Sequence, residues 1–127
     1  MKIFLDSIIL FVKDITLLKE FYNQSFGFTV EEEIGVTWVL LASGQFRIAL
    51  HQIPEEYIDK DDPDWNTENN VKMVYIIDDD LAAFRQKLIS NNVEVGDIQS
   101  WEGYPYDLFD GKDPEGNIFQ VKQAKVI

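Results

Sequence analysis

The chain has a single side chain of the type that most often moves protons near neutral pH, His51. It ends the run FRIALHQI (46–53), whose alternation predicts a strand with Arg47 and His51 on one face. His51 would serve as a proton shuttle or ligand contact, or it is a hydrogen-bonded or half-exposed strand-end histidine, which we favour. No Ser-His-Asp order, phosphate-binding glycine loop or suggestive carboxylate pair accompanies it, so the sequence indicates no catalytic residue.

Aromatic side chains are the second group with a possible role in recognition. They make up 13% of the chain, and the segment WEGYPY (101–106) concentrates several of them. Aromatic faces bind planar and cationic ligands, although core packing explains any single ring equally well. The candidate walls of a ligand cleft are Trp38, Trp101, Tyr104, Tyr106 and Phe109.

Composition narrows the possible partners. The net charge of −12 repels phosphate backbones, which argues against nucleic-acid binding, and it attracts cationic ligands. The chain has no cysteine, which excludes disulfides and thiolate metal sites and makes a cytoplasmic location the simplest expectation. No apolar run approaches the roughly 20 residues of a membrane span, and no signal peptide is expected.

Hydrophobic periodicity predicts the same order of elements twice. The first half reads as a strand, a helix capped by Asp14 or Thr16 with an apolar stripe, and three strands; the second half repeats this, with its helix capped within 78–80. We therefore predict a single α+β domain (1–127) of two β-α-β-β-β modules, one at about 1–53 and one at about 71–127. The predicted strands are 7–12, the part of 26–33 that follows a turn at Gly27, 37–43, 46–53, 71–77, 93–98, 106–112 and 117–123. The predicted helix stripes are Leu17, Leu18, Phe21 and Tyr22, then Leu81, Phe84 and Leu88.

Two connections carry further expectations. The polar segment 54–70 reads as a linker or a flap, with Tyr57 and Trp65 as its anchors. The run Asp113-Pro114-Glu115-Gly116 fits a type I turn, which would set the register of the last hairpin and carry no chemistry of its own.

Two longer motifs, FVKDITLLKEFYNQSFGF (11–28) and FDGKDPEGNIFQV (109–121), occur in this order within the repeated modules. With them the chain resembles the vicinal oxygen chelate superfamily, which includes glyoxalase I, bleomycin-resistance proteins, fosfomycin-resistance enzymes and extradiol dioxygenases. The resemblance covers nearly the whole chain. It implies a curved mixed sheet around a cleft, often completed by a homodimer.

In the metalloenzymes of that superfamily, four strand positions supply metal ligands, typically His, Glu, His and Glu. The resemblance maps these positions onto Ser7, Ala49, either Lys72 or Met73, and Gln120. A catalytic divalent metal needs about three good nitrogen or anionic oxygen ligands, which this set does not supply. We therefore expect no metal and no cofactor.

Two functional hypotheses remain, beside a third reading in which the cleft is closed and the domain serves only in association. In the first, the chain resembles bleomycin-resistance proteins: it is a homodimeric antibiotic-resistance protein that sequesters a cationic or aromatic small molecule without metal. In the second, it is a divergent lyase or isomerase of the glyoxalase type, with an atypical metal site or His51 as base. The candidate ligand-binding residues are Ser7, Trp38, Arg47, Ala49, His51, Trp101, Tyr104, Tyr106 and Gln120.

Overall fold

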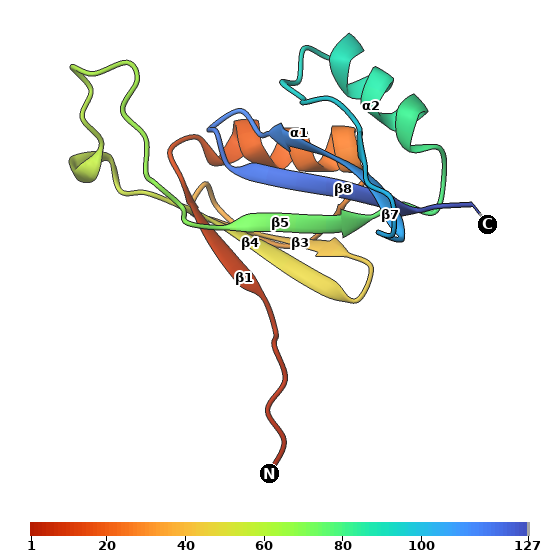
Figure 1. The fold of residues 1–127 in the computed structure, drawn as a ribbon. Helices are drawn as coiled ribbons and strands as arrows, with labels where there is room; N and C mark the ends of the chain where they lie inside the picture. The colour runs from red at the N-terminus through yellow and green to blue at the C-terminus, as the bar shows by residue number, and fades with distance from the viewer. Residues whose placement is uncertain (127) are drawn as a thin grey trace. The chain divides into compact units, whose positions relative to one another are not determined.

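The structure, a computed structural model, describes residues 1–126 and divides the chain into two compact units, Met1–Asn69 and Asn70–Ile127. Each unit contains a four-stranded mixed sheet and one α-helix (Figure 1). The α+β class and the two modules predicted from the sequence are confirmed. No helix in the described part of the chain is long and apolar enough to cross a membrane.

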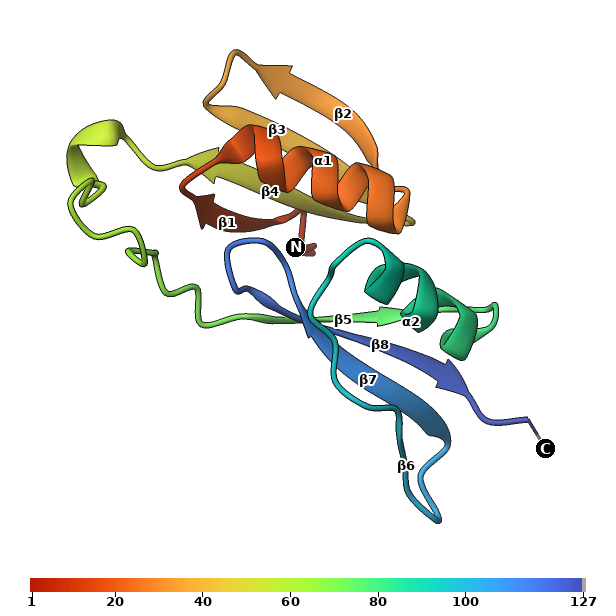
Figure 2. The same ribbon diagram turned by 90° about the horizontal axis from the view of Figure 1, so that it is seen from above.

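The first unit builds sheet A from the strands β1 (Ile8–Val12), β4 (Phe46–Gln52), β3 (Trp38–Ser43) and β2 (Thr29–Ile34), in that spatial order. β1 runs parallel to β4, and the other neighbours are antiparallel. Helix α1 (Ile15–Phe26) lies across one face of the sheet (Figure 2). Leu18 and Tyr22 of the helix are buried, as are Leu10, Val12 and Leu50 of the strands, and α1 contacts β3 and β4, so the core of this unit lies between α1 and sheet A.

Local signals set the ends of α1. The Asp14 carboxylate accepts a hydrogen bond from the Leu17 N–H at 3.1 Å, so Asp14 rather than Thr16 is the N-cap. Gly27 ends the helix at φ 71°, a left-handed conformation that favours glycine. The Gln52 amide then ties the strand to the helix: it accepts from the Ile15 N–H at 2.9 Å and donates to the Lys13 carbonyl at 2.8 Å.

The second unit repeats this plan in sheet B, ordered β5 (Lys72–Ile76), β8 (Ile118–Ala124), β7 (Tyr106–Lys112) and β6 (Gln99–Ser100). β5 is parallel to β8, and the other neighbours are antiparallel. Helix α2 (Leu81–Ser90) covers the face that carries Phe109 and Val121. Asp80 caps α2 by accepting from the Ala83 N–H at 3.2 Å.

The two units share a device that aligns them residue by residue. Gln123 accepts a hydrogen bond from the Leu81 N–H at 3.1 Å, as Gln52 does from the first residue of α1. Counting back three residues along the strand makes Gln120 the counterpart of Ala49. Strand pairing then extends the equivalence, because Ile9 pairs with Ala49 and Val74 with Gln120.

Two local expectations were wrong. The predicted strand 93–98 is replaced by an isolated bridge from Val95 to Gly111, and the regular strand follows it at 99–100. Leu17, placed in the apolar stripe of the first helix, is exposed, and Ile15 and Ser25 are buried instead. Each departure reflects tertiary packing, which decides between residues of similar local preference.

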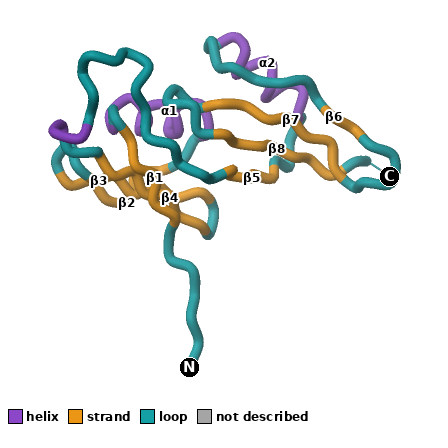
Figure 3. Tube along the Cα trace, turned by 60° about the vertical axis from the view of Figure 1, so that its left-hand side comes forward, coloured by secondary structure: helices purple, strands orange, loops and turns teal. Residues whose placement is uncertain are grey.

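The connection 54–70 forms a long loop with one short 3₁₀ turn, η1 (Glu55–Tyr57), and the N-terminal residues run extended into β1 (Figure 3). Tyr57 is exposed and does not anchor the loop. Trp65 does so through its backbone, because its carbonyl accepts from Lys13 Nζ at 2.8 Å. Asn69 binds both backbone groups of Phe11 on the outer edge of β1.

The predicted turn at Asp113–Gly116 forms, with a hydrogen bond of 2.9 Å from the Gly116 N–H to the Asp113 carbonyl. The buried Asp113 carboxylate accepts from the backbone N–H groups of Glu115 and Asn117 and from the Asn117 side chain. These bonds fix the β7–β8 register, which places Asp110 opposite Gln120.

Gly111 is required by a close approach within the second unit. A Cβ at this position would lie 2.4 Å from Cζ of the buried Phe119 ring, far inside van der Waals contact. We expect Gly111→Ala to lower the free energy of unfolding by about 1–3 kcal/mol in urea denaturation. Gly96→Ala is the matched control, since a Cβ there meets the Asp110 carbonyl at 3.7 Å, an ordinary contact. Equal effects of the two substitutions would contradict this prediction.

Candidate functional site

The face of sheet A that α1 leaves uncovered carries all five predicted site residues of the first unit. We call this the open face of sheet A. Its side chains alternate with the buried ones along each strand, which is why Ala49 and His51 point away from α1 while Ile48 and Leu50 point toward it. The open face of sheet A consists of Ser7, Ile9, Phe11, Trp38, Leu40, Ala42, Arg47, Ala49 and His51, bordered along β2 by Thr29, Glu31, Glu32 and Ile34.

Arg47 is not a free cation on this face. Its Nε donates to Glu31 Oε2 at 2.6 Å, and this hydrogen bond raises the pKa of the guanidinium above its ordinary value. β2 has a bulge between Val30 and Glu32, which provides the extra residue, Glu31, that makes this contact. Arg47, which the sequence places on the same strand face as His51, is therefore already part of an ion pair.

His51 lies between two aromatic rings. Phe11 and Trp38 are its direct neighbours across β1 and β3, with ring centroids 5.5 Å and 6.1 Å from the imidazole. The Trp38 indole Nε1 donates to Glu32 Oε1 at 2.8 Å. Among the described residues no hydrogen-bond partner orients the imidazole, which is the arrangement expected of a contact surface rather than of a positioned general base.

The open face of sheet B, the face away from α2, carries a closed polar network. Lys72 Nζ lies 2.8 Å from Asp110 Oδ2, and the Gln120 amide nitrogen donates to Asp110 Oδ1 at 3.0 Å. The three residues come from the neighbouring strands β5, β7 and β8. Both side chains therefore donate to one carboxylate, and the amide nitrogen of Gln120 points toward Asp110.

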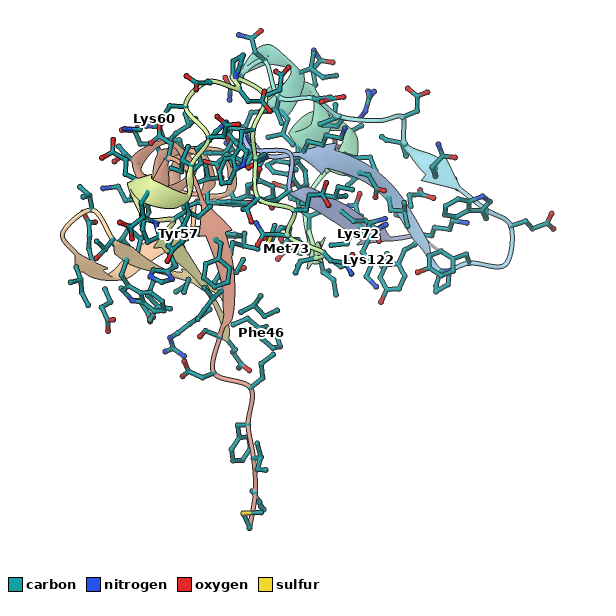
Figure 4. The ribbon with its side chains drawn as sticks, turned by 90° about the vertical axis from the view of Figure 1, so that its left-hand side faces the viewer. Phe46, Tyr57, Lys60, Lys72, Met73 and Lys122 are labelled. Carbon is teal, nitrogen blue, oxygen red and sulfur yellow. The ribbon has the colours of Figure 1, made fainter. Side chains whose placement is uncertain are left out.

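The sequence left open whether the third family ligand position falls on Lys72 or on Met73. The repeat assigns it to Lys72, because Lys72 shares the open face with Gln120 and corresponds to Ser7. Met73 is buried on the opposite face, where its sulfur accepts from the Tyr75 hydroxyl at 3.3 Å. Figure 4 shows Lys72 and Lys122 on the side of the sheet away from α2.

The predicted aromatic residues of the second unit gather at one end of sheet B. Trp101 and Tyr104 lie 6.1 Å apart, and Tyr104 and Tyr106 lie 5.9 Å apart, between ring centroids. Lys122 Nζ sits 4.3 Å above the Tyr106 ring, so a cation of the chain itself already occupies that face. Phe109 was also expected to form a wall of the cleft, and this expectation is wrong. The residue is buried under α2, with its ring 6.4 Å from that of Phe84.

A pocket of about 280 Å³ lies in the second unit, beside β7 and the segment that replaces the predicted strand. None of the nine predicted site residues lines this pocket. Asp110, which belongs to the polar network of sheet B, does line it. Its mouth includes Glu94 and Lys112, whose charged groups are 4.0 Å apart. The lining residues are Glu94, Val95, Gly96, Asp110, Gly111, Lys112 and Ile118.

The donor chemistry at the family ligand positions does not fit a divalent metal. Ala49 offers no ligand atom and is fully buried, and Lys72 presents an ammonium group. Gln120 and Ser7 supply only neutral oxygen, a weak ligand for such an ion. Within residues 1–126, no group of three or more His, Cys, Asp or Glu side chains is arranged to hold a metal.

Three residues of these faces were missed by sequence reasoning. The position of Asp110 on the open face could have been predicted, because Asp110 alternates with the buried Phe109 and the Asp113 turn places it opposite Gln120. Phe11 lies in the predicted strand 7–12 but was not included among the candidate site residues. The role of Glu32 could not be predicted, because the direction of its side chain depends on a β-bulge for which the sequence shows no pattern.

Comparison with protein-family models gives one match. Residues 4–121 match the model of the Glyoxalase/Bleomycin resistance protein/Dioxygenase superfamily. A search among curated protein sequences found no match.

Solved structures share the fold. An integron cassette protein from the mobile metagenome of V. pseudocholerae is 24% identical, with a TM-score of 0.73 over 99% of this chain and 98% of its own. Lactoylglutathione lyase from Agrobacterium tumefaciens is 17% identical, with a TM-score of 0.73 over 94% and 92%. The fosfomycin resistance protein FosX from Listeria monocytogenes is 13% identical, with a TM-score of 0.73 over 99% and 97%.

We expect divalent metals to leave the protein unaffected. Equimolar Zn²⁺, Ni²⁺ or Mn²⁺ should shift the melting temperature by less than about 1 °C, because a ligand stabilises only a protein that binds it. The double variant Lys72→His with Gln120→Glu puts an imidazole and a carboxylate beside Asp110 and should gain stability from Zn²⁺. Stoichiometric metal in the wild-type protein purified without chelators, lost in His51→Ala, would overturn this expectation.

Proposed function

Since the chain belongs to the glyoxalase/bleomycin resistance protein/dioxygenase superfamily, we propose that it binds a small organic molecule without metal and without altering it. The ligand class is cationic or aromatic, and the role that follows is sequestration of a toxic compound such as an antibiotic, in the cytoplasm. The observation that carries this proposal is the Lys72–Asp110–Gln120 network. Two of the four family ligand positions, Lys72 and Gln120, carry an ammonium and an amide, and both of these groups donate to Asp110.

Charge supports a cationic ligand. The first unit has five Lys and Arg against thirteen Asp and Glu, a net charge of −8, and the second has six against ten, a net charge of −4. Such a surface raises the local concentration of cations and disfavours anions such as phosphates. The exposed rings of Trp101, Tyr104 and Phe11 provide apolar area for a planar molecule.

The enzymatic alternative has less support. A lyase or isomerase of the glyoxalase type needs a metal or a positioned base, and Ala49 and Lys72 do not fit the metal. His51 makes ring contacts to Phe11 and Trp38 and is oriented by no described hydrogen-bond partner. The solved lactoylglutathione lyase shares the fold, and fold alone does not carry its activity to this chain.

A thermal-shift screen tests the proposed binding. Bleomycin-type glycopeptides and planar cationic compounds should raise the melting temperature by several degrees at about 100 times their dissociation constant, since this occupancy contributes roughly 2.7 kcal/mol. Neutral and anionic compounds of the same size are the controls. Mass spectrometry should recover the ligand chemically unchanged. No stabilisation by any cationic compound at millimolar concentration, or turnover of a bound compound, would contradict the proposal.

We also propose that the protein is a homodimer. Light scattering coupled to gel filtration should then give twice the chain mass of 14.8 kDa at micromolar concentration. A mass equal to one chain across the concentration range would refute this part of the proposal without affecting the binding test.

A further inference from the structure

We infer that the ligand-binding surface of the first unit is the aromatic row of Phe11, His51 and Trp38, with Glu32 at its end, and that its ligand is a planar aromatic cation. We call these four residues the aromatic row. The inference rests on the proposed function and gives it a site, a ligand class and a charge requirement.

The row follows directly from strand register. Phe11 pairs with His51 across β1 and β4, and His51 pairs with Trp38 across β4 and β3, so the three rings lie side by side on the open face of sheet A. Neighbouring strands are about 4.8 Å apart, which spreads the rings over roughly 10 Å, a length suited to a fused tricyclic ring system. Their planes are inclined by 49° and 65°, so a flat ligand would meet both faces and edges of rings.

Packing does not require these rings. The corresponding positions of the second unit hold Ile76, Lys122 and Leu108, which occupy the same places in the register of sheet B. Phe11 remains 47% exposed and His51 is also exposed, so neither side chain is needed to fill the core. The same fold forms in the second unit without an aromatic row, which leaves recognition as the reason for one in the first.

Charge selects a cation at the row. Glu32 accepts from the Trp38 indole, and within the described residues no Lys or Arg forms an ion pair with it. The nearby Arg47 is already neutralised by Glu31. An aromatic cation on the row would gain from the ring quadrupoles and from the Glu32 carboxylate together.

The second aromatic cluster is a weaker candidate for the same ligand. Lys122 lies over the Tyr106 ring, so an incoming cation would face an ammonium of the same sign. This contrast directs the test to residues of the first unit.

The experiment titrates the full-length protein with proflavine, a planar tricyclic cation, and follows its fluorescence polarisation. Phe11→Leu and Trp38→Leu remove one ring each and should weaken binding by about tenfold, because desolvated cation–aromatic contacts have this strength. Glu32→Gln keeps an acceptor for the indole and removes the charge, and it should weaken binding by about fivefold at low salt and less at high salt. Tyr57→Leu removes an exposed ring that belongs to neither aromatic group, and this variant should bind as the wild type does.

The matched control is Glu33→Gln, which removes the same charge one residue further along. Glu33 faces the helix side of sheet A, where it pairs with Lys19 at 3.3 Å, so its loss should change proflavine affinity by less than about twofold. 9-Anthracenecarboxylate, a planar anion, should not bind. Thermal melts check that each variant is folded, and the Glu32 and Glu33 pair decides the matter even if a ring variant is unstable.

Two failures are distinguishable. If proflavine or a compound from the thermal screen binds the wild type, but Phe11→Leu, Trp38→Leu and Glu32→Gln bind it unchanged, the aromatic row is not the site and the proposed function stands. If neither proflavine nor any cationic compound binds the wild type, both the row and the proposed function are overturned. Equal weakening by Glu32→Gln and Glu33→Gln would reduce the charge effect to the overall field and overturn the role of Glu32.

Discussion

Each sheet of this protein must bury one face under a single helix, and this constraint positions every candidate functional residue. In sheet A, Leu10, Val12 and Leu50 go under α1, so alternation sends Phe11 and His51 to the other face. A shift of β4 by one residue would exchange these sets and place the only histidine in the core. The glutamine that ties the end of the strand to the first turn of the helix helps to hold this register in both units.

Much of this arrangement was predictable because it depends on short-range patterns. Strand alternation, a helix cap at Asp14 or Thr16 and the Asp113 turn are encoded within a few residues. All three features form, and the structure selects Asp14 as the cap. The segment 93–98 failed because an alternating run forms a strand only where a neighbour is available to pair with it, and here only Val95 is bridged. The prediction that Phe109 lines the cleft was wrong for a similar reason. Tertiary packing decides which way such a ring faces, and here the ring faces a helix.

The site was less predictable than the fold because it depends on pairs of residues from different strands. Lys72, Asp110 and Gln120 are far apart in the sequence, and only the register of two strand pairings brings them together. The same holds for Phe11, His51 and Trp38. Sequence reasoning identified two members of each group and omitted the third, Asp110 in one group and Phe11 in the other, because it considered residues one at a time rather than as cross-strand neighbours.

The network on sheet B shows how side chains at the family ligand positions can bind one of the chain's own carboxylates. A lysine ammonium next to a carboxylate reproduces the charge balance of a cation with its ligand, and no external ion is needed. Because the pair is about half exposed, its contribution to the free energy of unfolding is small, of order 0–1 kcal/mol. Its main effect is chemical: the carboxylate of Asp110 is already engaged.

The β-bulge in β2 has a consequence for the number of acidic groups that the edge of sheet A can offer. A regular strand would set one side chain opposite Leu40, whereas the extra residue lets Glu31 and Glu32 share that place. The Glu31 carboxylate then forms an ion pair with Arg47, while the Glu32 carboxylate accepts a hydrogen bond from the Trp38 indole. If the strand were one residue shorter, a single carboxylate would be available to Arg47 and Trp38. The inserted residue therefore allows each of these side chains to bind its own carboxylate.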